Sequence, residues 1–124
     1  MSTTPEENKA IVREIFDKVI NAGNWELAAK YYKEDYIQHN PNVPQGLAGL
    51  QGAVKGLASF DPPMQAEIKL MNAEDDMVWL LIEWSGGGFP EGAPRMTSSA
   101  EIFRVEDGMM AEHWDVLQMA PPSK

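Results

Sequence analysis

The feature that most constrains this fold is a long hairpin near the carboxyl end of the chain. Residues 97–105 and 109–118 both alternate between polar and apolar side chains, which is the pattern of a β-strand. Asp107-Gly108 lies between them and is a strong signal for a tight turn. The sequence therefore predicts two long antiparallel strands whose side chains divide between two faces of a sheet.

The length of the turn determines which side chains share a face. We expect a three-residue loop in which Gly108 adopts the left-handed conformation of a bulge. This register places Glu101 opposite His113. It also places Ser99 opposite Asp115, so that two carboxylates and an imidazole share one face. The same face carries three apolar side chains, which are Phe103, Ala111 and Leu117. A two-residue loop instead shifts the register by one residue and separates this set.

Neither face of the predicted strand pair is purely apolar. The opposite face carries Arg104 and Glu112 among Ile102, Trp114 and Val116. The polar set described above could therefore line a cavity, or it could lie on the solvated side of an antiparallel sheet. The alternation predicts a sheet but does not decide which of its faces is covered.

The first half of the chain predicts three helices. A capping-box signature at residues 4–7 begins an amphipathic helix that continues to about residue 20. Asn24 is the expected cap of a second, shorter helix that ends near residue 32. Residues 47–60 predict the third helix. Three glycines in it would permit close approach of another backbone, and these are Gly49, Gly52 and Gly56.

Residues 34–46, between the second and third helices, are expected to form a rigid irregular loop. Pro41 and Pro44 fix its path and leave little room for a regular element. The loop presents His39 and Asn40, which are good substrate-positioning groups when held stiffly. Equally, Asn40 could cap a turn and His39 could be a solvated bystander.

Two further strands are predicted at residues 66–70 and 77–84. The second is nearly all apolar, so we expect both of its faces to be covered. Glu83 is its exception, and a carboxylate in such a strand needs an ionic partner or a neutral form. Residues 85–94 are expected to form a long hairpin loop, with a lid as the functional alternative. Residues 120–124 are expected to be a frayed tail.

Charge and composition limit the partners of the 124-residue chain. A formal net charge of −9 makes nucleic acids and anionic membranes poor partners, and a neutral or cationic small molecule is easier to bind. The chain has no cysteine, which fits a reducing cytoplasm, and no run of residues resembles a signal peptide or a membrane span. Eight methionines and four tryptophans suit an adaptable apolar pocket, or simply fill a core.

Three segments together resemble a known family. Residues 36–44 (YIQHNPNVP), 102–108 (IFRVEDG) and 112–116 (EHWDV) are similar to the SnoaL-like branch of the nuclear-transport-factor-two-like superfamily. The resemblance covers nearly the whole chain, so residues 1–124 are expected to form a single domain. It implies a cone-shaped α+β barrel in which three N-terminal helices pack into a curved antiparallel sheet around one apolar cavity. It also implies a homodimer that packs sheet to sheet.

The resemblance also implies a chemistry. Similar members are described as polyketide cyclases that catalyse an intramolecular aldol condensation, with a cavity aspartate as acid/base and no cofactor or metal. Asp115 is the best match for that aspartate, although some cyclases place the acid where this chain has Gln118. Glu101 replaces an aspartate of the branch. Leu81 and Glu83 stand where the branch often has histidines.

The predicted function is therefore that of a cofactor-free acid/base enzyme acting on a small apolar or polyketide-like carbonyl compound. The expected catalytic residues are Asp115, His113 and His39. His113 or His39 is expected to shuttle the proton, and His39 and Asn40 are the expected donors to an enolate oxygen. The expected substrate-binding residues are Asn40, Glu101, Tyr36, Glu83, Phe103 and Trp84.

Three other functions remain open on the sequence. The first is a non-catalytic ligand-binding domain, because a fold does not determine a function. The second is an epoxide hydrolase of the limonene-epoxide-hydrolase-like type, which needs an Asp-Arg-Asp set, whereas Arg104 is expected on the opposite face. The third is a metal site formed by two histidines and two carboxylates, namely His39, His113, Asp115 and Glu101.

Overall fold

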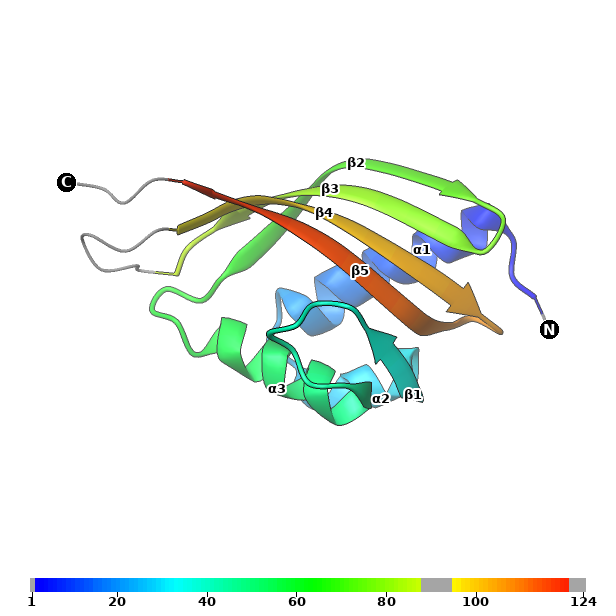
Figure 1. The fold of residues 1–124 in the computed structure, drawn as a ribbon, viewed down its shortest axis with the longest axis horizontal. Coiled ribbons are helices and arrows are strands. Elements are labelled where there is room, and N and C mark those ends of the chain that lie inside the picture. Colours follow the sequence, from blue (N-terminus) through cyan, green and yellow to red (C-terminus); the bar gives the residue numbers. More distant parts are fainter. Residues whose placement is uncertain (1, 88–94, 121–124) are drawn as a thin grey trace.

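The protein is an α+β domain in which a five-stranded mixed sheet curves over the helices, as seen in a computed structural model that describes residues 2–87 and 95–120 (Figure 1). The helical elements are α1 (Pro5–Ile15), a π-helical continuation (Phe16–Ile20), a 3₁₀ turn (Trp25–Leu27), α2 (Ala28–Tyr31) and α3 (Gly46–Ala58). The strands are β1 (Tyr32–Gln38), β2 (Gln65–Glu74), β3 (Met77–Ser85), β4 (Arg95–Glu106) and β5 (Met109–Ala120). Their order in the sheet is β1-β5-β4-β3-β2.

Helix α1 begins and packs as its sequence predicts. The Thr4 side chain accepts a hydrogen bond from the Glu7 amide, and the Glu7 carboxylate accepts one from the Thr4 amide. The apolar stripe then reaches the concave face of the sheet, where Val12, Ile15 and Val19 are fully buried in the core. The cap and the stripe together fix this helix beneath β2 and β3 (Figure 1).

The segment expected to be an irregular loop, residues 34–46, contains most of strand β1, so that expectation was wrong. The strand runs parallel to β5, and Gln38 pairs with His113. Tyr32 and Tyr36 are 2% and 1% exposed because alternate side chains point into the core. Pro41 and Pro44 do not interfere, since both follow the last residue of the strand.

The turn between β4 and β5 has two residues rather than the expected three. Asp107 and Gly108 both have positive φ angles, of 51° and 78°, and Glu106 pairs with Met109. Beyond the turn, a bulge leaves Ala111 as one extra residue in β5. The turn therefore shifts the register by one residue, and the bulge shifts it by one more.

These two shifts cancel with respect to the faces of the sheet. Glu101 lies opposite Asp115, and Phe103 lies opposite His113. The expected partner of Glu101 was His113, which lies two residues before the observed partner. The predicted register was therefore wrong by two residues. Because a shift of two residues preserves the alternation, the predicted set of polar groups still shares one face.

Close packing between α3 and the preceding loop positions the end of β1. Gln45 holds this loop, because its side chain accepts from the Gln38 amide at 3.0 Å and donates to the Gln38 carbonyl at 2.5 Å. Gly49 touches the loop so closely that a Cβ atom there would lie 1.9 Å from the Pro44 carbonyl oxygen. The predicted close approach is therefore made at Gly49, whereas a Cβ at Gly52 would meet nothing within 4 Å.

Strand β3 is covered on one face only, which corrects the expectation that both faces are covered. Val78, Leu80 and Ile82 are buried, whereas Trp79 and Leu81 are 51% and 40% exposed. The strand is apolar on its outer face as well as its inner one. Within the described residues, no helix has the length and apolar character needed to cross a membrane. Most of the predicted lid loop, residues 88–94, and the tail residues 121–124 lie outside the described residues.

Candidate active site

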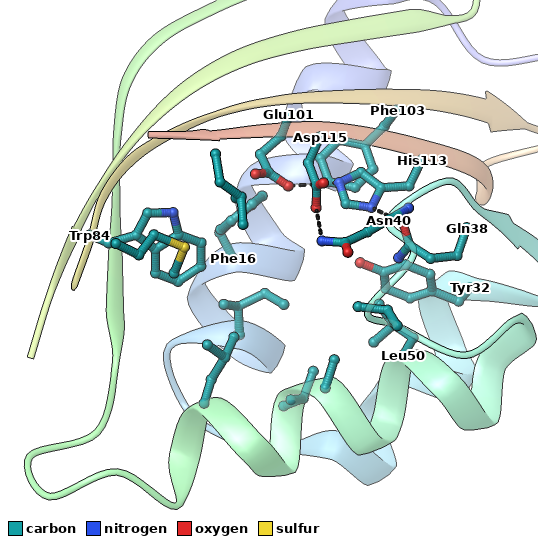
Figure 2. A pocket seen from close by; sticks show the side chains of 17 residues that line it. Phe16, Tyr32, Gln38, Asn40, Leu50, Trp84, Glu101, Phe103, His113 and Asp115 are labelled. Carbon is teal, nitrogen blue, oxygen red and sulfur yellow. Dashed lines mark hydrogen bonds and ion pairs between the residues drawn. The ribbon is translucent and has the colours of Figure 1, made fainter. Parts of the chain in front are cut away.

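The curved sheet and α3 enclose a cavity of about 180 Å³ (Figure 2). Most of its lining is apolar and comes from the π-helical continuation of α1, from α3, and from the carboxyl end of β3 and the amino end of β4. Representative apolar residues are Phe16, Leu50, Val54, Trp84 and Met96. The polar lining residues gather at one end, where β1, β4 and β5 meet, and these are Gln38, Asn40, Glu101, His113 and Asp115.

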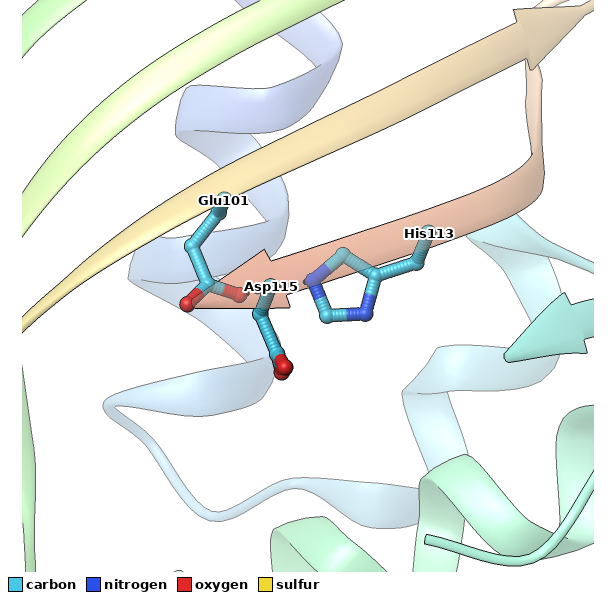
Figure 3. Close-up of side chains that lie close together, drawn as sticks. All are labelled: Glu101, His113 and Asp115. Carbon is cyan, nitrogen blue, oxygen red and sulfur yellow. Dashed lines mark hydrogen bonds and ion pairs between the residues drawn. The ribbon is translucent and has the colours of Figure 1, made fainter. Parts of the chain in front are cut away.

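Three titratable side chains on the inner face of β4 and β5 form the centre of this polar end (Figure 3). One side-chain nitrogen or oxygen atom from each of Glu101, His113 and Asp115 lies within 4.8 Å of the other two. The His113 Nε2 atom lies 2.6 Å from Glu101 Oε1, and both side chains are more than 90% buried. Burial removes both groups from water, so such a pair stabilises the fold only if its remaining hydrogen-bonding atoms also have partners.

The segment that follows β1 supplies the hydrogen bond to Asp115. The Asn40 side-chain amide donates to Asp115 Oδ2 at 3.1 Å. Its orientation is fixed, because Asn40 Oδ1 accepts a hydrogen bond of 2.9 Å from the Asn42 backbone amide. Among the residues that the structure describes, the second oxygen of Asp115 accepts no hydrogen bond. This oxygen is therefore available to a molecule in the cavity.

Tyr32 offers a free hydroxyl group to the same cavity. The residue is 2% exposed, and Figure 2 shows its hydroxyl pointing into the cavity from β1. Within residues 2–87 and 95–120 this hydroxyl makes no hydrogen bond. Burial, reinforced by the charge of Glu101, raises the pKa of Tyr32 well above its usual range. Tyr32 therefore stays protonated and can donate to an acceptor on a bound molecule.

Six of the nine predicted site residues line the cavity. These are Asp115, His113, Asn40, Glu101, Phe103 and Trp84. The other three, His39, Tyr36 and Glu83, do not line it. The sequence prediction did not include Gln38 and Tyr32, which also line the cavity. The even spacing of Tyr32, Tyr36 and Gln38 is the alternation of a strand, and it was the signal that could have found them.

His39 lies on the outer face of the sheet, so its position does not support the expected role as a proton shuttle. Its ring stacks on Trp114 at 4.7 Å between centroids, and its Nε2 atom lies 2.7 Å from Glu112 Oε2. The reason is the alternation of an extended chain, which turns His39 away when Gln38 and Asn40 face inwards.

Tyr36 and Glu83 lie outside the cavity for different reasons. Tyr36 is buried behind the lining, where its hydroxyl accepts a hydrogen bond of 3.0 Å from the Gln38 side chain. Glu83 points to the outer face, where its side chain is 64% exposed and lies 3.9 Å from Lys69. Trp84, its neighbour, faces the cavity and donates to Ser99 at 2.8 Å.

The ion pairs of Glu112 on the outer face give a pH-dependent stability. The hydrogen bond from His39, supported by Arg104 at 2.9 Å, lowers the pKa of Glu112 below 4.5 despite its partial burial. A carboxylate whose pKa is lower in the folded than in the unfolded state stabilises the fold above its unfolded pKa. This contribution is lost as the pH falls through the folded pKa.

We therefore expect Glu112→Gln to lower the free energy of unfolding by about 1 kcal/mol at pH 7, and by much less at pH 3. Urea unfolding of both proteins at the two pH values measures this difference. An equal loss at pH 3 and pH 7 would show that the contribution of Glu112 does not depend on its charge.

A cation could in principle use the same three inner groups. Glu101, His113 and Asp115 offer one imidazole and two carboxylates, a donor set suited to a divalent transition metal. In this structure, however, His113 and Glu101 are bonded to each other. Metal analysis of the purified protein tests whether an ion replaces this hydrogen bond.

Comparison with known protein families identifies the family of this chain. The family model described as the SnoaL-like domain matches residues 12–113, which include the polar end of the cavity up to His113. The chain belongs to the SnoaL-like domain family. The resemblance drawn from the three sequence segments is thereby confirmed. No curated protein sequence matches the chain.

Solved structures share the fold of this SnoaL-like domain. AclR from Streptomyces galilaeus, described as a candidate hydroxylase, is 28% identical over 95% of this chain and 83% of its own, with a TM-score of 0.75. A candidate polyketide cyclase from Acidithiobacillus ferrooxidans is 27% identical over 95% and 92%, with a TM-score of 0.74. An NTF2-like protein of unknown function from Cytophaga hutchinsonii is 15% identical over 95% of both chains, with a TM-score of 0.71. The fold is therefore NTF2-like.

Proposed function

We propose that this SnoaL-like protein is a cofactor-free acid/base enzyme that acts on a small apolar carbonyl compound, with Asp115 taking and returning a proton. The observation that carries this proposal is a carboxylate at the polar end of an apolar cavity, held by Asn40 through one oxygen only. The other oxygen can reach a carbon-bound proton of a molecule that fills the apolar part.

Tyr32 supports the proposal because proton removal next to a carbonyl places negative charge on the carbonyl oxygen. A protonated hydroxyl in a buried site stabilises that charge more strongly than water does. Tyr32 is buried, keeps its proton and has no other hydrogen bond among the described residues. It replaces His39 as the expected hydrogen-bond donor to the carbonyl oxygen.

The size of the cavity limits the substrate. An apolar protein cavity of about 150 Å³ binds benzene. The cavity here is somewhat larger, at about 180 Å³, and is lined mainly by apolar groups. We therefore propose a substrate with one or two rings, of the kind formed in an aldol cyclisation. The similarity to a candidate polyketide cyclase supports this substrate class.

Deuterium exchange tests the reaction class without knowledge of the natural substrate. Cyclohexanone, 2-tetralone and 1,3-cyclohexanedione are incubated with the protein in D₂O, and loss of the α-proton signal is followed by NMR. We expect exchange of at least one ketone faster than in buffer alone. Absence of acceleration for ketones that bind to the protein would contradict the proposal.

A ligand-binding domain without catalysis is the second candidate. It is favoured by the mutual hydrogen bonds of Glu101, His113 and Gln38, which leave these groups less free for chemistry. Binding of a ketone without exchange would support it. Epoxide hydrolysis has less support, because Arg104 points to the outer face towards Glu112 and no arginine lines the described cavity.

The outer face of the sheet leads us to propose a homodimer. Trp79, Ile102 and Trp114 form a row across β3, β4 and β5, and Trp79 is 51% exposed. The next row includes Leu81 and Val116, which are 40% and 68% exposed. A continuous apolar surface of this kind is typical of an interface between subunits.

We expect Trp79→Arg to convert a wild-type dimer into a monomer, because it places a charge on this apolar surface. Size-exclusion chromatography with light scattering measures the mass. Glu6→Arg is the control, since the Glu6 side chain is 83% exposed on the first turn of α1. A monomeric wild-type protein would contradict the proposed dimer.

A further inference from the structure

Gln38 makes more contacts at the polar end of the cavity than its neutral side chain would suggest. It is 5% exposed and is the last residue of β1. Its Nε2 atom donates to the Tyr36 hydroxyl at 3.0 Å. Its Oε1 atom accepts from the Asn40 backbone amide at 3.1 Å and lies 3.1 Å from His113 Nδ1. One buried amide thus joins the backbone that follows β1 to the imidazole of β5.

These contacts determine where the His113 ring carries a proton. A backbone amide can only donate, so the Gln38 atom that faces the Asn40 amide must be the carbonyl oxygen. The same oxygen faces Nδ1 of His113, and two acceptors cannot form a hydrogen bond with each other. Nδ1 of His113 is therefore the protonated nitrogen, whether the ring is neutral or charged.

The other ring nitrogen then shares a single proton with Glu101. His113 Nε2 and Glu101 Oε1 are 2.6 Å apart, which requires a hydrogen atom between them. The pair is either a neutral imidazole with a carboxylic acid or an imidazolium with a carboxylate. Both forms contain one transferable proton and have no net charge. Asp115 is then the remaining carboxylate of the three groups.

No other charged side chain lines this part of the described structure. Glu101 comes from β4, Asp115 from β5, and the phenols Tyr32 and Tyr36 come from β1. The π-helical continuation of α1 and helix α3 contribute only apolar side chains to the cavity, such as Phe16. The protonation of the site is therefore decided by the two carboxylates, the imidazole and the amide that orients it.

We propose that Gln38 is a positioning residue that holds His113 in the Nδ1–H form, which makes the Glu101–His113 pair the proton donor and Asp115 the proton acceptor of the site. This assignment of roles rests on the proposed function. Asp115 takes the α-proton of the ketone, and the electron pair of that C–H bond forms the C=C bond of the enol. The carbonyl oxygen receives the π electrons and the proton of the pair, and the reverse transfers restore all groups.

Nitrogen NMR of the histidine side chains tests the first half of this proposal. The chain has two histidines, and His39→Asn assigns the remaining signals to His113. In the wild-type protein we expect the neutral His113 ring to carry its proton on Nδ1. A neutral His113 ring whose Nδ1 atom carries no proton would overturn the proposal, and the spectrum of the wild-type protein alone gives this result.

Two substitutions of Gln38 separate its orienting role from a purely structural one. Gln38→Leu removes the acceptor and should allow the Nε2–H form of the neutral ring. Gln38→Glu keeps an acceptor oxygen for His113 and for the Asn40 amide, so it should retain the Nδ1–H form. If the leucine variant does not fold, Gln38→Met replaces it. Retention of the Nδ1–H form in the folded leucine or methionine variant would contradict the role of Gln38.

Deuterium exchange of a ketone that the wild-type protein accepts tests the second half. We expect Gln38→Leu to slow exchange by about 10- to 100-fold, as seen when groups that orient a metal-bound histidine are removed. Gln38→Glu should retain more of the rate. Exchange by a wild-type protein with the Nε2–H form would refute this inference and leave the proposed function intact. The Nδ1–H form without any exchange would refute the proposed function and the assigned proton roles, and would leave only the orienting role of Gln38.

Discussion

Asp115→Asn is expected to slow enzyme-dependent α-proton exchange by about 10²- to 10⁴-fold, the usual contribution of a general base. The substitution preserves the shape of the side chain. An asparagine oxygen can also still accept the hydrogen bond that the Asn40 amide donates to Asp115. The fold and the cavity should therefore be unchanged, and only the capacity to accept a proton should be lost. NMR-detected exchange of the same ketone measures the effect.

Glu83→Gln is the matched control for this experiment. It also removes one carboxylate from the sheet, but from the outer face of β3, where the Glu83 side chain is 64% exposed. Its exchange rate should equal that of the wild-type protein. Isothermal titration with the ketone shows whether both variants still bind. An Asp115→Asn variant that binds and exchanges the ketone at the wild-type rate would exclude Asp115 as the base.

Gly49→Ala is expected to destabilise the fold by about 2 kcal/mol, the second large effect. A Cβ atom at this position would lie 1.9 Å from the Pro44 carbonyl oxygen, which belongs to the backbone and cannot rotate away. Forcing extra atoms into a packed region costs about 1–3 kcal/mol. Alanine has a helix propensity about 1 kcal/mol more favourable than that of glycine, which offsets part of the steric cost. A steric cost of about 3 kcal/mol, the upper end of this range, therefore gives the expected net loss.

Gly52→Ala in the same helix isolates the propensity effect. A Cβ atom at Gly52 meets nothing within 4 Å, so this variant should gain up to about 1 kcal/mol. Urea unfolding of the two variants measures both changes. Because Gly49 packs on the loop that carries Asn40, its alanine variant should also weaken ketone binding. A stabilised Gly49→Ala protein would show that the loop moves freely and does not hold Asn40 in place.

The parts of the fold that depend on local patterns could be predicted from the sequence. The cap at Thr4, the three helices and the terminal hairpin all follow from signals within a few residues. The inner face bearing Glu101, His113 and Asp115 was also predicted, although by a register that was wrong by two residues. The predicted faces were nevertheless correct. Successive side chains of a strand point to opposite faces, so a register error of two residues leaves each side chain on the same face.

The parts that depend on distant pairing could not be predicted in the same way. Strand β1 forms because it pairs with β5, and Gln38 and its partner His113 are 75 residues apart. No local signal in residues 34–46 indicates that partner. Without β1, the sequence did not indicate which of His39 and Asn40 faces the cavity. Tyr32 and Gln38 were missed as cavity residues because their alternation with Tyr36 was not recognised as a strand.

The positions of two predicted site residues, His39 and Glu83, have a simpler explanation. The prediction included His39 with Asn40, and Glu83 with Trp84, as pairs of site residues. Neighbouring residues in extended chain point to opposite faces, so one member of each pair had to point away. In both pairs the structure places the second member at the cavity and the first on the outer face. Applying the alternation to every candidate would have removed this conflict.

The bulge at Ala111 decides which side chains of β5 reach the cavity. In a strand pair that kept every residue but lost this bulge, the two-residue turn would place Ala111 opposite Arg104 and Trp114 opposite Glu101. Trp114 and Val116 would then point into the cavity, and His113 and Asp115 would face outwards. Deletion of Ala111 removes only the extra residue and leaves Glu101 opposite Asp115. Descendants of this chain can therefore lose the bulge together with its residue, but not the bulge alone, if the acid groups are to stay inside.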